Sequence, residues 1–245
     1  MARIFVELNK LAQTFLDILY PRCCVSCNTE MEKQNGFLCW DCRSQVELIK
    51  KPYCEKCGDP VEGVVMHQYC CSSCCDDPPA FLLARSAFRY RGVAKKVIQA
   101  FKYYNMIGLT AELVDYLRAL WEINCSGIAA DAVVGVPLFP GKERRRGYNQ
   151  SFLLGKGLAS RLNIEFDATR LRRIKDTGTQ TNLSAVERRR NVKDAFVVRE
   201  DKWTDGRFFI LVDDVMTTGA TVRACSLALM RAGAKGVVVL TLARG

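Results

Sequence analysis

The sequence predicts an α/β protein, with a parallel sheet flanked by helices and a small cysteine-rich module in front of it. Apolar runs at 132–136, 208–212 and 236–242 have the length and composition of strands that are buried on both faces. Segments of helical character separate these runs, as in βαβ units. Eleven of the thirteen cysteines lie between Cys23 and Cys75, so the chain has two regions of different kinds.

Length and composition allow one main domain and a smaller one. The chain has 245 residues, of which 49% are hydrophobic and 25% charged, enough to bury a sizeable core. We expect an N-terminal helix at 1–21, a metal-binding module at 22–80 and the α/β domain at 81–245. A run of about 20 uncharged apolar residues, which a transmembrane helix requires, is not found in the sequence. Because the sequence shows no secretory signal, we expect a cytoplasmic protein.

Residues 1–21 are expected to form an amphipathic helix. Its apolar face is predicted to pack on the protein itself, with docking on a membrane surface as the alternative. Charged residues interrupt the apolar core that a signal peptide would need. The apolar positions at helical spacing are Ile4, Leu8, Leu11, Phe15 and Ile18.

The cysteine-rich segment contains four C-x-x-C pairs. One pair could be a redox motif, but four predict two zinc sites, because the two-residue spacer lets a tight turn present both sulfurs to one ion. Disulfides would instead require an oxidising compartment. Interleaved pairing and a ligand role for His67, the only histidine, both stay open. Consecutive pairing gives one site of Cys24, Cys27, Cys39 and Cys42 and a second of Cys54, Cys57, Cys71 and Cys74.

Charge is divided unevenly along the chain. Residues 1–80 carry a net charge of −3 and residues 81–245 a net charge of +13. A small cysteine-rich module has too little apolar mass for its own core, so bound zinc would supply its folding energy. Its negative charge argues against a basic finger that grips nucleic acid alone. The module is therefore expected to be structural.

The α/β domain is expected to begin with one or two helices within 92–121, followed by the strand at 132–136. A helix is predicted from about Tyr148, and a further helix from about Ser184, where Ser184 and Glu187 can form a capping box. After the strand at 208–212, a helix should span 219–232 and end at Gly233. With the strand at 236–242 it completes a βαβ unit, which places a ligand at the crevice beyond the strands.

The run FFILVDDVMTTGATV at 208–222 carries the candidate binding site. Asp213 and Asp214 follow the apolar strand, at the end where ligands bind in open α/β sheets. The next residues supply hydroxyl groups, a glycine and the amides of a helix N-terminus, which suit a phosphate. The alternative is a strand end with two solvated acids and a helix cap. The phosphate-binding candidates are Thr217, Thr218, Gly219, Ala220 and Thr221.

A Walker B strand of an NTPase would also be apolar and end in Asp. Such a protein needs a P-loop, and the nearest candidate starts at Gly135. Its spacer is one residue too long, and Glu143 stands where Ser or Thr should bind magnesium. The sequence therefore argues against an NTPase.

Cationic residues cluster in two further segments. The loop after the strand at 132–136 could hold a polyphosphate, which needs several donors held together, although a solvated basic turn is the alternative. The second segment, 170–190, is polar in its first half. The candidates in the first loop are Lys142, Arg144, Arg145, Arg146 and Gly147.

The Asp-Asp strand end with its Thr-Thr-Gly-x-Thr loop resembles the phosphoribosyl pyrophosphate (PRPP) motif of type I phosphoribosyltransferases. The resemblance implies the type I phosphoribosyltransferase fold, in which the acidic pair holds the ribose hydroxyls, 217–221 holds the 5′-phosphate and 142–147 binds pyrophosphate, with magnesium bound to PRPP. It also implies a hood over the site within 170–190 that excludes water. The hood candidates are Gln180, Arg188 and Arg190, and the catalytic candidates are Asp213, Asp214, Arg188 and Lys102.

The order of the blocks narrows this resemblance. An N-terminal helix ending at Pro21, the cysteine pairs, Phe101-Lys102-Tyr103, VPLFPGKERRRGYNQ, TQTNLSAVERRRNVKDAF and the Asp-Asp loop together resemble the ComF family over nearly the whole chain. The resemblance implies a role in natural transformation or in the use of external DNA, with competence-machinery proteins as partners.

Two classes of function remain open. The first is a phosphoribosyltransferase whose acceptor the motifs do not reveal. The second is a non-catalytic competence factor that binds single-stranded DNA or PRPP. A domain of charge +13 favours a polyanion, and Tyr103 or Tyr148 could stack a base.

Overall fold

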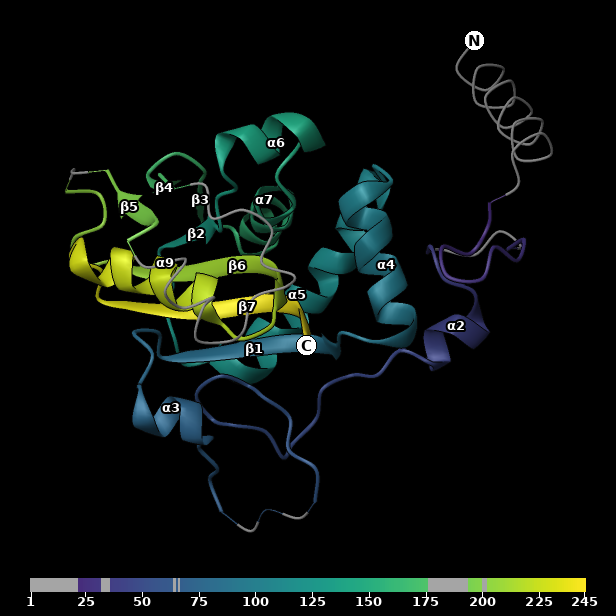
Figure 1. The fold of residues 1–245 in the computed structure, drawn as a ribbon, viewed down its shortest axis with the longest axis horizontal. Helices are drawn as coiled ribbons and strands as arrows, with labels where there is room; N and C mark the ends of the chain where they lie inside the picture. Colours follow the sequence, from purple (N-terminus) through teal and green to yellow (C-terminus); the bar gives the residue numbers. More distant parts are fainter. Residues whose placement is uncertain (1–21, 32–35, 64, 66, 176–193, 200–201) are drawn as a thin grey trace.

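The structure, a computed structural model, describes residues 22–31, 36–63, 65, 67–175, 194–199 and 202–245. Its centre is a five-stranded parallel sheet in the order β1-β7-β6-β2-β3 (Figure 1). A separate antiparallel pair is formed by β4 and β5. The predicted parallel sheet is confirmed. The strands are β1 (Leu83–Arg89), β2 (Ala132–Gly135), β3 (Glu165–Asp167), β4 (Leu171–Arg173), β5 (Phe196–Val198), β6 (Phe208–Met216) and β7 (Gly236–Arg244).

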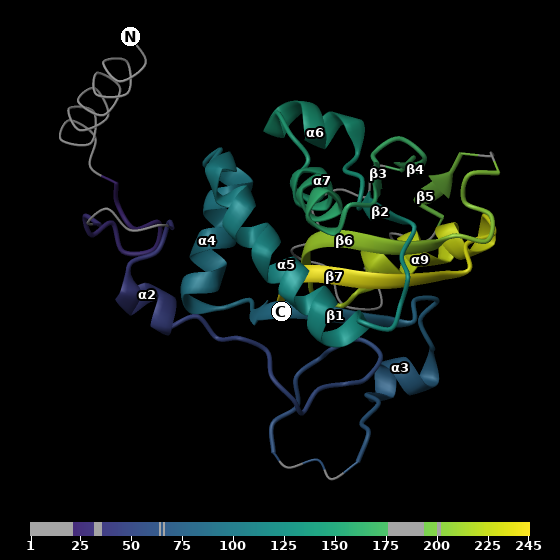
Figure 2. The same ribbon diagram turned by 180° about the vertical axis from the view of Figure 1, so that it is seen from behind.

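Helices cover both faces of the sheet (Figures 1 and 2). Alternate residues of β6 point into two separate apolar clusters, because successive side chains of a strand face opposite ways. Ile210 and Val212 lie in the cluster with α4, α5 and α7, and Leu211 lies in the cluster with α9. The apolar run of β6 is thus buried on both faces, as predicted. The helices are α4 (Gly92–Tyr103), the 3-10 helix η1 (Ile107–Leu109), α5 (Thr110–Cys125), α6 (Pro140–Arg146), α7 (Gln150–Leu162) and α9 (Ala220–Arg231).

The strand that carries the two acids is longer than the sequence predicts. Its hydrogen-bonded neighbour β7 continues to Arg244, and β6 pairs with it as far as Met216. On the other side, β2 stops at Gly135, opposite Val212. Asp213 and Asp214 therefore lie in the part of β6 that is paired with a strand on one side only.

The predicted loop at 142–147 is mostly helical. Pro140 occupies the first turn of α6, Glu143 also lies in that turn, and three arginines occupy the last turn, an order that suits the helix dipole. Gly147, with φ of 84°, ends the helix in the left-handed conformation. The expectation of a cationic loop at 142–147 was wrong, because these local helix signals prevail.

The next helix, α7, begins at Gln150 rather than at Tyr148. Asn149 caps it, since its side-chain oxygen accepts a hydrogen bond of 3.0 Å from the Ser151 amide. The first turn of α7 lies close against β2: a methyl group added at Gly135 would come within 2.9 Å of the Ser151 carbonyl oxygen. This close approach brings Ser151 to the end of the sheet where the two acids lie.

The cysteine-rich segment covers the outer edge of β1. The Ile49 amide donates to the Ala87 carbonyl at 2.9 Å, and the Ala84 amide donates to the Lys56 carbonyl at 2.7 Å. Two short helices, α2 (Trp40–Ser44) and α3 (Ser72–Asp76), belong to this segment and lie beyond the sheet in Figure 1. The backbone of β1 is therefore hydrogen-bonded on both sides.

β1 itself was not predicted from the sequence, because polar residues interrupt its apolar pattern. Arg85 and Ser86 are buried within it, and each has a specific partner. The Arg85 side chain pairs with Glu55 at 3.2 Å, and Ser86 shares a hydrogen bond of 2.6 Å with Thr241 of β7. Such partners are supplied by tertiary structure and leave no signal in a local window.

Candidate functional site

Two groups of four cysteines come together in the cysteine-rich segment. We call these two groups zinc site 1 and zinc site 2. In each, the sulfur atoms all lie within 4.8 Å of one another. The consecutive pairing is the one observed, and exposed His67 belongs to neither group. Zinc site 1 is Cys24, Cys27, Cys39 and Cys42, and zinc site 2 is Cys54, Cys57, Cys71 and Cys74.

The same local structure recurs in both groups. We call each C-x-x-C turn a knuckle. After the first knuckle of each site the chain turns through a left-handed residue, Asn28 with φ of 60° in site 1 and Gly58 with φ of 66° in site 2. The second knuckle of each site starts a short helix, with Cys39 and Cys71 as the N-cap residues.

Sulfur spacing fits a tetrahedral zinc ion. Zinc–sulfur bonds of about 2.3 Å place neighbouring sulfurs about 3.8 Å apart. Cys27 and Cys39 approach to 3.7 Å in site 1, and Cys57 and Cys71 approach to 3.7 Å in site 2. Hydrogen bonds from Thr29 lower the pKa of Cys27 to about 6, which favours its thiolate, whereas burial raises the pKa of several other thiols of the two sites.

The two acids of β6 each contact a different helix. Asp213 accepts a hydrogen bond of 2.8 Å from the Ser151 hydroxyl on α7. Asp214 forms an ion pair of 2.9 Å with the ammonium group of Lys102 on α4. The Asp214 amide also donates to the Asp213 carboxylate at 2.9 Å. The structure thus brings Lys102, Asp213 and Asp214 together.

Burial shapes the charge of this group. Burial and the neighbouring charge of Asp214 raise the pKa of Asp213 to about 7, against the opposing effects of Ser151 and Lys102. Burial lowers the pKa of Lys102, but the attraction of Asp214 outweighs it and the net shift is upward. At neutral pH Lys102 therefore carries its charge, while Asp213 is close to its pKa and is partly protonated.

The threonine loop lies directly after β6. Gly219 is the N-cap of α9 and has φ of 75°, a conformation that favours glycine. The Thr218 hydroxyl accepts a hydrogen bond of 3.4 Å from the Ala220 amide, and the loop also holds exposed Thr217 and half-buried Thr221. The first turn of a twelve-residue helix thus opens onto the loop, which suits an anion.

Four cations gather near the acids. Burial, followed by the charges of Arg146 and Arg173, lowers the pKa of Lys142, and Lys102 acts in the same direction. The Arg146 guanidinium donates to the Gln150 side chain at 2.6 Å and lies 5.2 Å from the centre of the Tyr103 ring. These cations come from α4, α6 and β4, so a polyanion could contact several of them at once.

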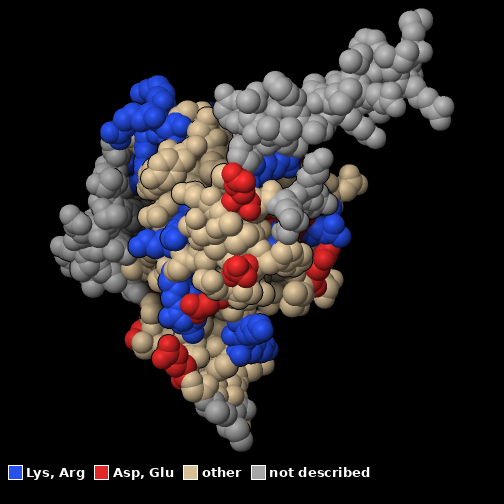
Figure 3. Space-filling model, turned by 90° about the vertical axis from the view of Figure 1, so that its right-hand side faces the viewer, with Lys and Arg blue, Asp and Glu red and all other residues tan. Residues whose placement is uncertain are grey.

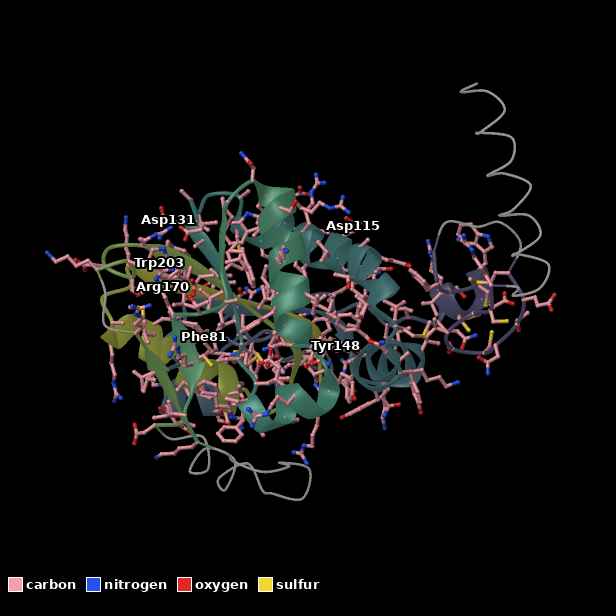
Figure 4. All side chains as sticks on the ribbon, turned by 90° about the horizontal axis from the view of Figure 1, so that it is seen from above. Phe81, Asp115, Asp131, Tyr148, Arg170 and Trp203 are labelled. Carbon is pink, nitrogen blue, oxygen red and sulfur yellow. The ribbon has the colours of Figure 1, made fainter. Side chains whose placement is uncertain are left out.

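The other two arginines of α6, Arg144 and Arg145, are exposed. Lys and Arg side chains are visible at the top of the molecule, at the level of α6, in Figure 3. Tyr148, beside the end of α4 in Figure 4, donates its hydroxyl to the Phe101 carbonyl and packs near the Phe101 ring. Of the two tyrosines suggested for base stacking, Tyr103 is the exposed one.

Several predicted residues lie outside the described part of the chain. Gln180, Arg188 and Arg190 fall in 176–193, as does the helix expected from Ser184, and the helix expected at 1–21 is also outside. In the described part, sequence reasoning missed Ser151 and Arg173. Arg173 stood within a cationic segment that was noticed, whereas Ser151 becomes recognisable only when α7 packs on β2.

Among the described residues, no helix combines the length and the apolar character needed to span a membrane. The N-terminal part of the chain, residues 15–76, matches a family model described as a double zinc ribbon domain. This match and the two four-cysteine groups support two zinc sites.

Curated relatives match most of the chain. Competence protein F of Haemophilus influenzae is 32% identical over 225 residues, which cover 90% of this chain and 96% of that protein. DNA utilization protein YhgH of Escherichia coli K12 is 32% identical, covering 84% of this chain and 96% of the relative. Competence protein ComFC of Bacillus subtilis is 26% identical, covering 86% of each.

Two solved structures illustrate the partial similarity of the chain path. Glutamine PRPP amidotransferase from B. subtilis has 20% identity and a TM-score of 0.40, over 59% of this chain and 30% of that one. Adenine phosphoribosyltransferase from Saccharomyces cerevisiae has 21% identity and a TM-score of 0.38, over 57% of this chain and 72% of that one.

Metal analysis tests the zinc assignment. Protein purified without chelator is expected to contain two zinc ions per chain, and Cys27→Ser and Cys74→Ser are each expected to lose one. Cys125→Ser is the control, because Cys125 is buried outside both groups and its replacement should leave the zinc content unchanged. Fewer than one zinc per chain in the unmodified protein would show that the cysteines serve another purpose.

The raised pKa of Asp213 predicts a specific pH dependence of stability. Between about pH 4 and pH 7 the native state holds this proton and the unfolded chain does not, so the free energy of unfolding falls as pH rises. Asp213→Asn keeps an acceptor for Ser151 without the buried charge. We expect this variant to match the wild type near pH 4 and to be more stable by about 4 kcal/mol at pH 8.

Urea unfolding at a series of pH values measures this difference. Two curves that remain parallel from pH 4 to pH 8 would show that Asp213 titrates at an ordinary pKa.

Proposed function

The chain belongs to the ComF family, and from that premise we propose that it binds PRPP together with magnesium at the end of β6 and acts in the uptake or use of external DNA. The names of its relatives, competence protein F and DNA utilization protein, support the role with DNA. The geometry at the end of β6 supports the sugar phosphate.

One observation carries the proposal of a sugar-phosphate site. Two carboxylates, a hydroxyl-rich loop at a helix N-terminus and a group of cations meet where β2 ends beside β6. Carboxylates accept hydrogen bonds from vicinal hydroxyls, while helix amides and cations attract phosphates. A ligand with a diol, a monophosphate and a pyrophosphate would use all three groups.

Each group has a separate role in this proposal. Asp213 and Asp214 would accept hydrogen bonds from the ribose hydroxyls, and the Asp214 carboxylate would exchange part of its contact with Lys102 for that of the ligand. The loop 217–221 would hold the 5′-phosphate. Lys142 and Arg146 would face the pyrophosphate together with Lys102, the nearest cation to the acids.

The carboxylates present oxygen ligands of the kind that magnesium prefers, which fits an ion that arrives with PRPP. When bound, magnesium would neutralise charge on the pyrophosphate. The protein's own contribution to transfer would be to position C1′ and to stabilise the departing pyrophosphate with cations, so that no protein nucleophile is needed. Gln180, Arg188 and Arg190 stay as predicted hood residues. On this view the protein is a phosphoribosyltransferase with an unidentified acceptor.

PRPP binding should appear as a thermal shift. With magnesium and PRPP at about one hundred times the dissociation constant, the native state should gain roughly 2.7 kcal/mol, and the melting temperature should rise. Replacing Asp213 and Asp214 with Ala together should abolish this shift. Asp115→Asn is the control, because Asp115 is an exposed acid of α5, paired with Arg161 (Figure 4).

If PRPP with magnesium does not change the melting temperature of the unmodified protein, PRPP is not its ligand. If PRPP binds but a panel of nucleobases and small amines releases no pyrophosphate, the protein is a PRPP-binding factor rather than a transferase.

A non-catalytic DNA-binding factor is the second candidate, and an exposed surface favours it. Tyr103 is 66% exposed and Tyr104 is 76% exposed, next to Lys102 at the end of α4. Arg146 lies over the Tyr103 ring, and Arg144 and Arg145 are exposed on the same short helix. Exposed aromatic rings beside cations suit single-stranded DNA, whose bases stack while its phosphates pair with arginines.

The salt dependence of DNA affinity tests this second candidate. Affinity for an oligothymidine should fall steeply with salt, and Arg144→Ala with Arg145→Ala should reduce the slope by about 0.7 for each phosphate that is no longer neutralised. The matched control replaces exposed Lys202 and Lys235, which precede β6 and β7 at the opposite end of the sheet. Equal slopes for the two double variants would remove α6 from the DNA-binding surface.

A further inference from the structure

Zinc site 2 lies in the same apolar cluster as the threonine loop. Cys54, Cys57 and Cys74 are buried in the cluster that also contains Met216 and Ala220, the residues on either side of 217–219. Zinc site 1 instead contributes Cys24 and Cys42 to the cluster on the other face of the sheet. The two sites therefore differ in what they can influence.

Arg223 connects the second knuckle of zinc site 2 to the helix that follows the loop. Its amide donates to the Gly219 carbonyl at 2.9 Å, which closes the first turn of α9. Its guanidinium donates to the Ser73 carbonyl at 3.1 Å and to the Cys74 sulfur at 3.5 Å, and it contacts Asp77. The side chain is only 12% exposed, so these bonds are shielded from water.

Arg244 connects the first knuckle of the same site to the strand that precedes the loop. Its guanidinium donates to the Met216 carbonyl at 3.1 Å and forms an ion pair of 3.1 Å with Asp59. Asp59 follows the first knuckle, and its carbonyl accepts a hydrogen bond of 2.8 Å from the Cys54 amide. The Arg244 side chain is 9% exposed.

We propose that zinc site 2 is a positioning element for the phosphate loop 217–221, with Arg223 and Arg244 as the positioning residues. One arginine holds the chain before the loop and the other holds it after the loop, and each reaches a different knuckle. The ion joins the two knuckles, so it fixes the distance between the two anchors. This proposal rests on the proposed function, and it links zinc occupancy to the binding of a sugar phosphate.

The binding of zinc at site 2 and the binding of a sugar phosphate at the loop are expected to strengthen each other. Zinc at site 2 holds the loop amides in place before the ligand arrives, which removes an ordering cost from binding. By linkage, a bound sugar phosphate must in turn raise the affinity of site 2 for zinc by the same factor. Zinc site 1 provides the comparison: Arg43, which directly follows its second knuckle, pairs with Glu112 of α5 at 3.0 Å.

Hydrogen exchange of the loop amides tests the proposal without any ligand. In Cys74→Ser, the amides of 217–223 should exchange at least about tenfold faster than in the wild type, because both anchors lose their fixed spacing. In Cys27→Ser, which affects zinc site 1, their exchange should be unchanged. The proposal would be overturned if these amides exchange as slowly in both variants as in the wild type. It would also be overturned if their exchange is faster by the same factor in both variants.

A second experiment uses variants that retain all eight ligands. Arg223→Met and Arg244→Met should each weaken PRPP binding about tenfold in isothermal titration, and speed the extraction of one zinc by a chromogenic chelator. Arg43→Met is the matched control and should leave PRPP affinity unchanged. PRPP affinity that stays at the wild-type value in both Arg223→Met and Arg244→Met would contradict the proposal. If the wild type binds no PRPP, the proposed ligand fails, while hydrogen exchange still decides the role of zinc site 2.

Discussion

Two adjacent carboxylates at the buried end of β6 set the arrangement of the elements around them. Their charges repel each other, and burial removes the water that would stabilise them. Each acid therefore requires its own partner, and the partners come from different helices: Ser151 from α7 and Lys102 from α4. The close approach of α7 at Gly135 and the end of α4 at Tyr103 place those partners within reach. The groups that stabilise the two buried carboxylates are also the groups that the proposed chemistry uses.

Much of this arrangement is visible in the sequence, because it depends on local patterns. The strands at 132–136, 208–212 and 236–242, the helix after Gly219 and the two sets of four cysteines all follow from apolar runs and short motifs. The parts that were missed depend on distant partners. β1 contains buried Arg85, whose partners include the distant residues Glu55 and Asn124, and Ser151 gains its role only through the packing of α7 on β2. The helix in segment 142–147 was missed for a different reason, because its positive charge suggested a cationic loop.

Charge and metal are distributed in a complementary way. The cysteine-rich segment is acidic and the α/β domain is basic, and ion pairs across their boundary join Glu55 to Arg85, Asp59 to Arg244 and Asp77 to Arg223. Those arginine side chains are nearly buried, whereas their acidic partners are partly exposed. The apolar cores on the two faces of the sheet each contain cysteines of one zinc site. Zinc bound at the two sites would therefore stabilise both layers of the protein and not only the segment that binds it.

The backbone pairing of residues 47–56 with β1 gives the cysteine-rich segment a protective function. An uncovered edge strand offers unpaired amides and carbonyls to other copies of the chain, which is a route to aggregation. In this protein the covering segment is irregular, and it lies between the second knuckle of zinc site 1 and the end of the first knuckle of zinc site 2. A chain shortened to begin at residue 81 would expose the edge of β1 from Leu83 to Arg89, and we expect loss of zinc to loosen the same cover. Selection for a soluble sheet could by itself keep the cysteines in place, independently of any ligand.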